Sequence, residues 1–150
     1  MVEVLVALVV VGVGMLGIAS LYVTTLQAKT TAQARMKAIN FAYDIADRIR
    51  ANRTAGDSYA MTIGSTLTAP SSTTNCIEST DMAAITCTPA QMAANDLYSW
   101  NKLVTDPIQG LPGASGSIAV ANANPTTYTI TLQWSEPSSG TQSYKLTVEI

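Results

Sequence analysis

The chain has 150 residues, and once an apolar N-terminal run is set aside about 125 remain, enough for one small domain. It contains no histidine, which excludes Ser-His-Asp and Cys-His catalysis and every histidine-containing zinc pattern, so we expect no enzyme activity, no cofactor and no bound metal. Residues 1–53 carry six basic and three acidic side chains, net +3, whereas residues 54–150 carry two basic and seven acidic ones, net −5, and this acidic region lacks the clustered Lys and Arg that nucleic-acid binding requires.

An apolar run occupies residues 4–23, interrupted only by Ser20 and the hydroxyl of Tyr22, and Glu3 directly precedes it. As a helix, such a run reaches about 30 Å, the thickness of the hydrocarbon core of a bilayer. The run therefore predicts a membrane span. Because a carboxylate at the edge of that span is unfavourable in lipid, we expect Glu3 to have a partner. The alternative is an acid at a helix start, stabilised by the helix dipole alone by ~0.3–1 kcal/mol.

Within the run, Gly12, Gly14 and Gly17 spell Gly-x-Gly-x-x-Gly, by letters the fingerprint of a dinucleotide site. Such a site needs a strand before the glycines and a second strand, ending in an acidic residue, about 20 residues further on. The sequence after the glycines instead favours a continuous helix. We therefore expect no nucleotide binding, and predict that the glycines only loosen the helix.

The helix is predicted to continue through residues 26–53, which contain no Gly or Pro. Apolar residues recur there at spacings of three and four, which is typical of an amphipathic helix packed on a domain core. The predicted buried stripe comprises Met36, Ile39, Tyr43, Ala46 and Ile49, widened by Ala38, Ala42 and Ile45. Asp44 and Asp47 lie near Arg48 and Arg50, which indicates a charged surface rather than a catalytic carboxylate pair.

Cys76 and Cys87 lie in a segment rich in Ser, Thr and Asn. This setting favours a disulfide that closes a surface loop outside the cytoplasm; two free thiols are the alternative. The Lys and Arg residues after the span favour the opposite orientation, with the head in the cytoplasm. A basic leader upstream of Met1, removed by processing, would reconcile the two signals.

The head is predicted to combine a loop, a short helix and a small antiparallel sheet. Residues 63–75 predict an irregular loop, and Thr88, Pro89 and Gln91 predict a helix start with a capping box. That helix is expected to end near Asp106, with an apolar face of Ala93, Leu97, Trp100 and Val104. Alternating residues predict strands over 117–121, 128–134 and 144–148, with residues 136–143 joining the last two. The long helix would cover the apolar face of the sheet, with Trp100 and Trp134 in the core.

Two segments resemble a known family. Residues 1–8, MVEVLVAL, with the glycine-containing apolar run that follows, resemble the mature N-terminus of type IV pilins and pseudopilins. Residues 87–101, CTPAQMAANDLYSWN, with LPG at 111–113 and the strand ending at Trp134, are similar to the minor pilin family called PilV. Members usually have two further residues before the position of Met1, the first an often N-methylated Phe. The chain is therefore expected to be trimmed at its start.

The resemblance implies an α+β, type IV pilin-like fold in which a long N-terminal helix packs on a small antiparallel sheet, with one short extra helix. It implies three parts: residues 1–25 as the transmembrane and filament-core half of the helix, 26–53 as its amphipathic half, and 54–150 as a periplasmic or extracellular head. It also implies that Glu3 pairs with the N-terminal ammonium of a neighbouring subunit during assembly.

By the same resemblance, the expected function is that of a minor pilin, a structural subunit that primes a type IV pilus and sits near its tip, supporting adhesion and twitching motility. Its expected partners are other minor pilins, the major pilin and a tip adhesin. Its expected location is the bacterial inner membrane, with the head in the periplasm, and the extracellular pilus after assembly. The alternatives are a pseudopilin of a type II secretion system and a single-pass anchored binding domain that does not assemble.

Overall fold

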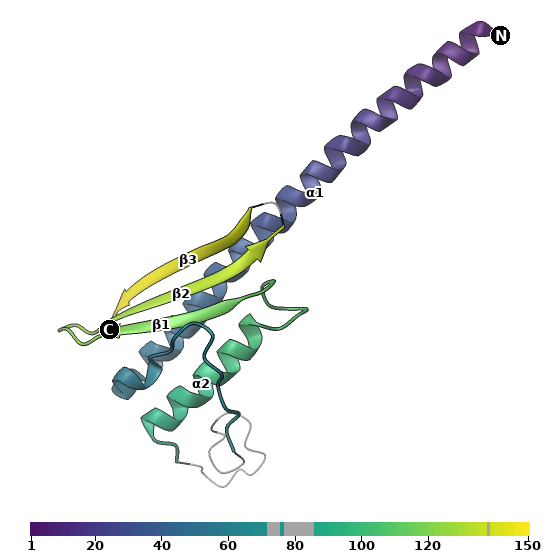
Figure 1. Ribbon diagram of the computed structural model, residues 1–150. Coiled ribbons are helices and arrows are strands. Elements are labelled where there is room, and N and C mark those ends of the chain that lie inside the picture. The colour runs from purple at the N-terminus through teal and green to yellow at the C-terminus, as the bar shows by residue number, and fades with distance from the viewer. Residues whose placement is uncertain (72–75, 77–85, 138) are drawn as a thin grey trace. The chain divides into compact units, whose positions relative to one another are not determined.

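The computed structural model describes residues 1–71, 76, 86–137 and 139–150. Its elements are one long helix, a short 3₁₀ segment, a second helix and three strands (Figure 1). In chain order they are α1 (Val2–Ala51), η1 (Arg53–Tyr59), α2 (Pro89–Val104), β1 (Ser115–Ala121), β2 (Thr127–Glu136) and β3 (Gly140–Glu149). This arrangement confirms the predicted α+β, type IV pilin-like fold. The chain divides into two compact units, Met1–Arg35 and Met36–Ile150, and the second unit is called the head below.

The three strands form one antiparallel sheet in the order β1-β2-β3. Alternate side chains of β2 point into the core, as strand geometry requires, and the predicted alternation over residues 128–134 is confirmed. The buried residues are Tyr128, Ile130, Leu132 and Trp134. At the β1 edge of the sheet, Met61 forms an antiparallel bridge with Ile118 of β1. The sequence did not predict this bridge.

The last hairpin is longer than predicted. The segment 136–143 was expected to join two strands, but β2 continues to Glu136 and β3 begins at Gly140. Gly140 has a positive φ of 68°, which an L side chain rarely adopts, so glycine fits where the chain turns into β3. β1 also begins earlier than predicted, at Ser115.

The part of α1 that belongs to the head buries five of the eight residues of the predicted stripe. Its buried residues are small or β-branched: Ala38, Ala42, Ile45, Ala46 and Ile49. Met36, Ile39 and Tyr43 are exposed, with 65, 37 and 48% of their surface accessible, so their assignment to the core was wrong. Alanine lets the rest of the head approach the helix axis closely, and close packing then selects the alanine face rather than the face with the largest side chains. The helix also ends at Ala51, before the predicted Arg53.

α2 begins as the sequence predicted. The Thr88 hydroxyl accepts a hydrogen bond from the Gln91 backbone N–H, the Gln91 side chain accepts one from the Thr88 backbone N–H, and Pro89 is the first helical residue. This capping box satisfies backbone donors that a helix start leaves free. All four residues of the predicted apolar face are buried: Ala93, Leu97, Trp100 and Val104.

Trp100 fixes α2 against two other elements. Its indole Nε1 donates to the Phe41 carbonyl of α1 at 2.8 Å. Its ring lies over Gly116 of β1, where a Cβ would come within 2.6 Å of the ring, so only glycine fits there. Trp134 is also buried and donates to Glu136 Oε1 at 3.1 Å. Both tryptophans are core anchors, as predicted.

A disulfide joins Cys76 and Cys87, with a Cα–Cα distance of 6.1 Å. Asn95 of α2 supports it: the Asn95 side-chain oxygen accepts from the Cys76 backbone N–H at 3.1 Å. Residues 63–71 form neither helix nor strand, as predicted, and the remainder of the predicted loop at 72–75 lies outside the described residues.

Candidate assembly surface

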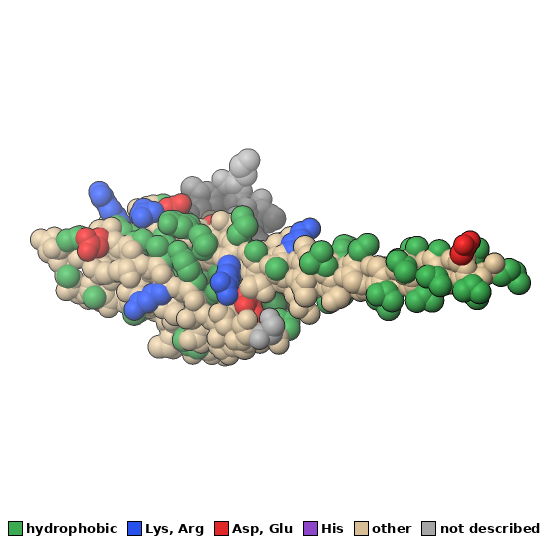
Figure 2. Space-filling model, turned by 90° about the horizontal axis from the view of Figure 1, so that it is seen from above, with side chains coloured by type: hydrophobic (Ala, Val, Ile, Leu, Met, Phe, Trp, Pro, Cys, Tyr) green, Lys and Arg blue, Asp and Glu red, His purple; other side chains and the backbone are tan. Residues whose placement is uncertain are grey.

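The N-terminal unit exposes its apolar side chains on every side. All residues from Met1 to Thr30 are exposed, and hydrophobic side chains project from both edges of this part of α1 in the view of Figure 2. In the described chain, α1 is the helix long and apolar enough to cross a membrane, with a mean hydropathy of 2.7 over its most apolar window and none of that window buried. An apolar surface of this extent needs cover from lipid or from other proteins.

Threonine hydroxyls at the end of the apolar run are satisfied within the helix. Thr24 and Thr25 each donate from Oγ1 to the Leu21 carbonyl, at 2.8 and 2.9 Å, and Thr30 donates to the Gln27 carbonyl at 2.8 Å. A hydroxyl that bonds back to its own helix leaves no donor unmet in an apolar medium. The polar residues of this segment are therefore compatible with burial in lipid or among other helices.

Glu3 is the acidic residue of the apolar segment and lies in the first turn of α1. Its side chain is exposed, and among the described residues it has no ion-pair partner. The next charged residue along the chain is Lys29. A carboxylate in this setting is favoured by the helix dipole, but no countercharge among the described residues pairs with it.

The three glycines lie inside α1, with helix on both sides and no strand before them. This arrangement cannot form the strand–turn–helix of a dinucleotide site, so the fingerprint is a coincidence of letters. A Cβ added at Gly12, Gly14 or Gly17 would meet nothing within 4 Å. The glycines therefore do not serve close packing within the chain itself.

A polar network links α1, η1 and α2 inside the head. Asp96 of α2 accepts from the Tyr59 hydroxyl at 2.7 Å and pairs with the Arg48 guanidinium at 3.3 Å. Asn52 donates to the Tyr59 oxygen at 3.2 Å and to the Pro89 carbonyl at 2.8 Å. A buried carboxylate is tolerated when it is paired and hydrogen-bonded. The network explains how Asp96 can be buried. The network has a structural role, because it holds α1, η1 and α2 together.

The pKa of Tyr59 is raised well above its ordinary value of 10.0, first by burial and then by its hydrogen bond to Asp96. A phenol with a raised pKa stays neutral at physiological pH and acts as a hydrogen-bond donor. Burial, together with the nearby Asp57, also raises the pKa of Tyr128. Neither tyrosine is activated as a nucleophile.

Asp44 and Asp47 of α1 belong to ion pairs on the surface of the helix. Asp44 pairs with Arg48 at 3.1 Å, and Asp47 pairs with Arg50 at 2.7 Å. This confirms the interpretation of the segment as a charged surface. Across the residues that the structure describes, no three Cys, Asp or Glu side chains gather where a metal ion would bind.

Comparison with known families gives one match. The Tt1218-like family model, described as type IV pilin Tt1218, matches residues 20–98, which is more than half of the chain. The chain belongs to this type IV pilin family. No curated protein and no solved structure matches it.

Membership of a pilin family gives the exposed apolar helix a physical role. Pilins are structural, non-enzymatic proteins, and an apolar N-terminal helix fits a pilin anchored in a membrane and associated with other pilins. The matched residues 20–98 include the Cys76–Cys87 disulfide and the capping box of α2. They also include most of the polar network, so these features of the pilin head lie where the family match is found.

A shallow pocket of about 350 Å³ lies beside the disulfide among the described residues of the head. It is lined by Arg48, Ala51, Asn52, Cys87, Pro89, Met92 and Asp96. Its charged groups already pair with one another, and Asn52 is held by Tyr59 and Pro89. Sequence reasoning missed this cluster because its members are far apart along the chain. The polar Tyr59 and Asp96 gave no periodic signal.

Proposed function

We propose that this pilin is a minor pilin of the PilV type, a subunit that helps to prime a type IV pilus and sits near its tip. The observation that supports the proposal most is the exposed apolar segment of α1 headed by Glu3, in a chain that belongs to a type IV pilin family. In this proposal, residues 1–25 form the membrane-spanning and filament-core half of the helix and 26–53 its amphipathic half. Residues 54–150 form the globular part that lies in the periplasm or outside the cell.

Glu3 has the chemistry for an assembly contact. An unpaired carboxylate next to an apolar surface is costly, and a countercharge supplied by another subunit removes that cost. We infer that Glu3 accepts the N-terminal ammonium of a neighbouring subunit, as the family resemblance implies. The partners are other minor pilins and the major pilin, together with an adhesin at the tip. On assembly, residues 1–25 leave the lipid and pack against the same segment of neighbouring subunits. Their apolar surface stays out of contact with water in both settings.

The test replaces Glu3 in cells that make pili and measures the chain in sheared fibres. Glu3→Ala is expected to leave the chain in the membrane fraction but to lower its amount in sheared fibres by more than about tenfold, because one partner of a buried charge pair is lost. Glu3→Asp keeps the charge and serves as the matched control, so it should retain substantial incorporation.

Three results would contradict the proposal. Normal incorporation of the Glu3→Ala variant would show that the charge pairing is dispensable. Absence of the unsubstituted chain from sheared fibres that contain other pilins would favour an anchored domain that does not assemble. Recovery of the chain with a secretion apparatus and never with pili would favour a secretion pseudopilin.

A further inference from the structure

The two edges of the sheet differ. At the β1 edge, Ile118 exchanges both backbone hydrogen bonds with Met61, at 2.8 and 2.9 Å, so that edge is closed where the chain returns. At the other edge, β3 is the outermost strand, and within the described residues no segment pairs with it (Figure 1). A long strand with an unpaired edge is a template for pairing with another chain.

The register shows which backbone groups face outward. Thr126 and Ile150 exchange both backbone hydrogen bonds, and the pairing of β2 with β3 runs in unbroken register from that pair. Hydrogen-bonded pairs alternate along antiparallel strands, so the even-numbered residues of β3 bond to β2 and the odd-numbered ones face the open edge. The same alternation places Ile118 on the outer edge of β1, where Met61 indeed bonds to it.

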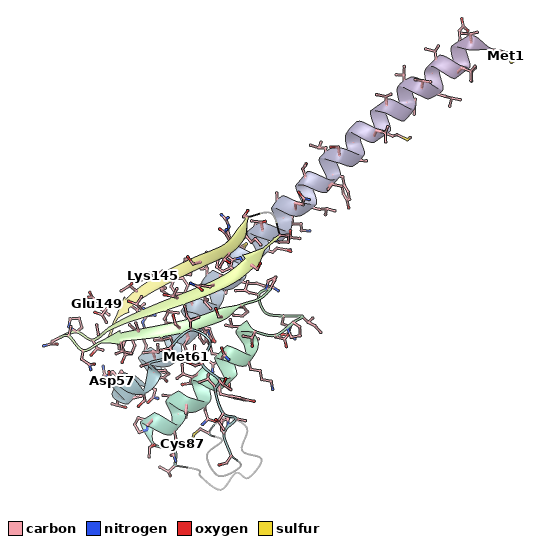
Figure 3. The ribbon with its side chains drawn as sticks, in the orientation of Figure 1. Met1, Asp57, Met61, Cys87, Lys145 and Glu149 are labelled. Atoms are coloured by element: carbon pink, nitrogen blue, oxygen red, sulfur yellow. A yellow bond between two sulfur atoms is a disulfide. The ribbon has the colours of Figure 1, made fainter. Side chains whose placement is uncertain are left out.

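The outward-facing residues form a short recognition strip. Thr141 is excluded from it, because its carbonyl already accepts a hydrogen bond from the Gln142 side chain. The strip comprises Ser143, Lys145, Thr147 and Glu149, and all four side chains are exposed. Lys145 and Glu149 lie four residues apart on β3 (Figure 3). They give the strip a basic position and an acidic position on one face.

The core side of the same strand is incompletely covered. Tyr144 and Leu146 point to the face that holds Leu132 and Ile130 of β2, their register partners. Leu132 and Ile130 are fully buried, whereas Tyr144 and Leu146 are only partly buried. An added strand would place alternate side chains against them and remove this apolar surface from water.

We propose that the edge of β3, residues 143–149, binds an extended segment of another polypeptide as a fourth, antiparallel strand. The segment carries an acidic residue opposite Lys145, a basic residue opposite Glu149, and apolar residues on the side of Tyr144 and Leu146. Backbone hydrogen bonds supply affinity, and the charged and apolar positions supply register. This interaction concerns the head alone and goes beyond the pilus assembly proposed above.

A second copy is a poorer occupant. A two-fold axis that joins two β3 strands antiparallel also reverses every element lying along the sheet. Residues 36–51 of α1 run along the sheet within the head (Figure 1), so the two copies would have antiparallel α1 helices. Pairing with a second copy therefore requires two heads in opposite directions, whereas pairing with a segment from a different polypeptide does not.

The first experiment measures backbone hydrogen exchange by NMR on the full chain in detergent micelles. The probe is a synthetic peptide, Lys-Val-Thr-Val-Glu-Val-Thr, designed to run antiparallel to β3. The peptide should newly protect the amides of Ser143, Lys145 and Thr147, whereas Tyr144 and Leu146, already bonded to β2, should not change. Protection without this alternation, or none at saturating peptide, would overturn the proposal.

A matched pair of variants tests the outward N–H. Thr147→Pro removes a donor that faces the open edge without removing a bond to β2, and it should weaken peptide binding about fivefold or more. Thr147→Val keeps the donor and should bind within about twofold of the unsubstituted chain. Near-ultraviolet circular dichroism of Trp100 and Trp134 checks that both variants fold. Equal binding by folded variants would contradict strand addition.

A charge exchange tests the register and the occupant. Lys145→Glu should weaken binding about two- to tenfold, and a peptide with Lys in place of Glu should restore it. Failure of the exchanged peptide to restore binding would overturn the stated register. Sedimentation of the full chain without peptide should show no self-association through β3. A dimer that protects the same alternate amides would identify a second copy as the occupant instead.

Discussion

The two units of this pilin differ in the exposure of their apolar side chains. In Met1–Arg35, Val13 exposes 65% of its surface and nothing in that unit covers it, whereas in the head Ile45 of the same helix α1 is completely buried. The first unit contains the apolar run of residues 4–23, and the second buries a face rich in alanine against its own domain. One continuous helix therefore has one part whose cover comes from within the chain and one part whose cover comes from outside it.

This difference separates two properties of the protein. The stability of the head depends on contacts within the head, such as Trp100 with Phe41 and Gly116. In the proposed function, membrane anchoring and assembly depend on the exposed surface of residues 4–23. Substitutions in the head should therefore change its stability without changing membrane anchoring, and substitutions in residues 4–23 should do the reverse.

The largest effect is expected from Trp100→Ala. Trp100 is completely buried and donates to the Phe41 carbonyl, so its loss should lower the free energy of unfolding of the head by ~3–5 kcal/mol. Denaturant unfolding of the full chain in micelles measures the free energy of unfolding. The share of the variant chain recovered in the membrane fraction should equal that of the unsubstituted chain. Tyr43→Ala, at a half-exposed position, is the control and should change stability by less than ~0.5 kcal/mol. A loss below ~1 kcal/mol for Trp100→Ala would contradict the packing described.

The converse effect is expected from Val13→Lys. A charge at the centre of the span costs ~2.5–3.5 kcal/mol on insertion scales, so the variant should shift substantially out of the membrane fraction. Unfolding of the head should not change. Ala28→Lys, next to Lys29 and outside residues 4–23, is the matched control and should insert normally. Equal insertion of both variants would argue against residues 4–23 as the membrane segment.

A smaller effect distinguishes the two faces of α1. Ala42 is buried at 1% exposure, so Ala42→Leu overfills a close contact and should cost ~1–3 kcal/mol of head stability. Ala32→Leu makes the same change at an exposed position of the same helix and should be nearly neutral. The difference between the two midpoints of denaturant unfolding is the measurement. If both variants are neutral, the alanine face is not closely packed.

The smallest effect concerns alkaline pH. The raised pKa of Tyr59 means that the fold favours the neutral phenol, so this contribution is complete below the ordinary tyrosine pKa of 10.0 and is lost as pH rises from there towards the raised value. The stability of the head should therefore fall above about pH 10. Tyr59→Phe should fall less steeply, with the remaining slope coming partly from Tyr128, whose pKa is also raised. The same slope in both proteins would contradict burial of a neutral Tyr59.

Much of the head could be predicted because its signals are local. The capping box of Thr88, Pro89 and Gln91 fixes the start of α2 within a few residues, and the alternation in β2 needs only the contrast between its two faces. The start of β3 gave no such contrast. Its inward position there is Gln142, flanked by Thr141 and Ser143, so a polar residue stands on both faces and no alternation is visible.

Other features depended on contacts that a linear pattern does not contain. The buried face of α1 was predicted too wide: Ala38 and Ala42 are buried as predicted, but pattern reasoning also assigned the larger apolar residues Met36, Ile39 and Tyr43 to the core, and these are exposed. The bridge between Met61 and Ile118 joins segments far apart in the chain. The apolar segment at residues 4–23 was predicted from sequence alone, because a long apolar run is a local signal, and the assembly role of Glu3 stays a prediction. The outward-facing residues of β3 could not be predicted, because they follow from the register of its pairing with β2.

The most direct test of the account places a photo-crosslinking amino acid at Val13, in the centre of the exposed apolar segment. Before assembly, irradiation of membranes should give adducts with lipid. In sheared fibres, it should instead give adducts with another pilin, mapped by mass spectrometry to the N-terminal helix of that pilin. Two results would contradict the claim that the apolar segment of α1 moves from lipid to contacts with neighbouring pilins. The chain could be absent from fibres rich in other pilins, or it could be present there without such adducts.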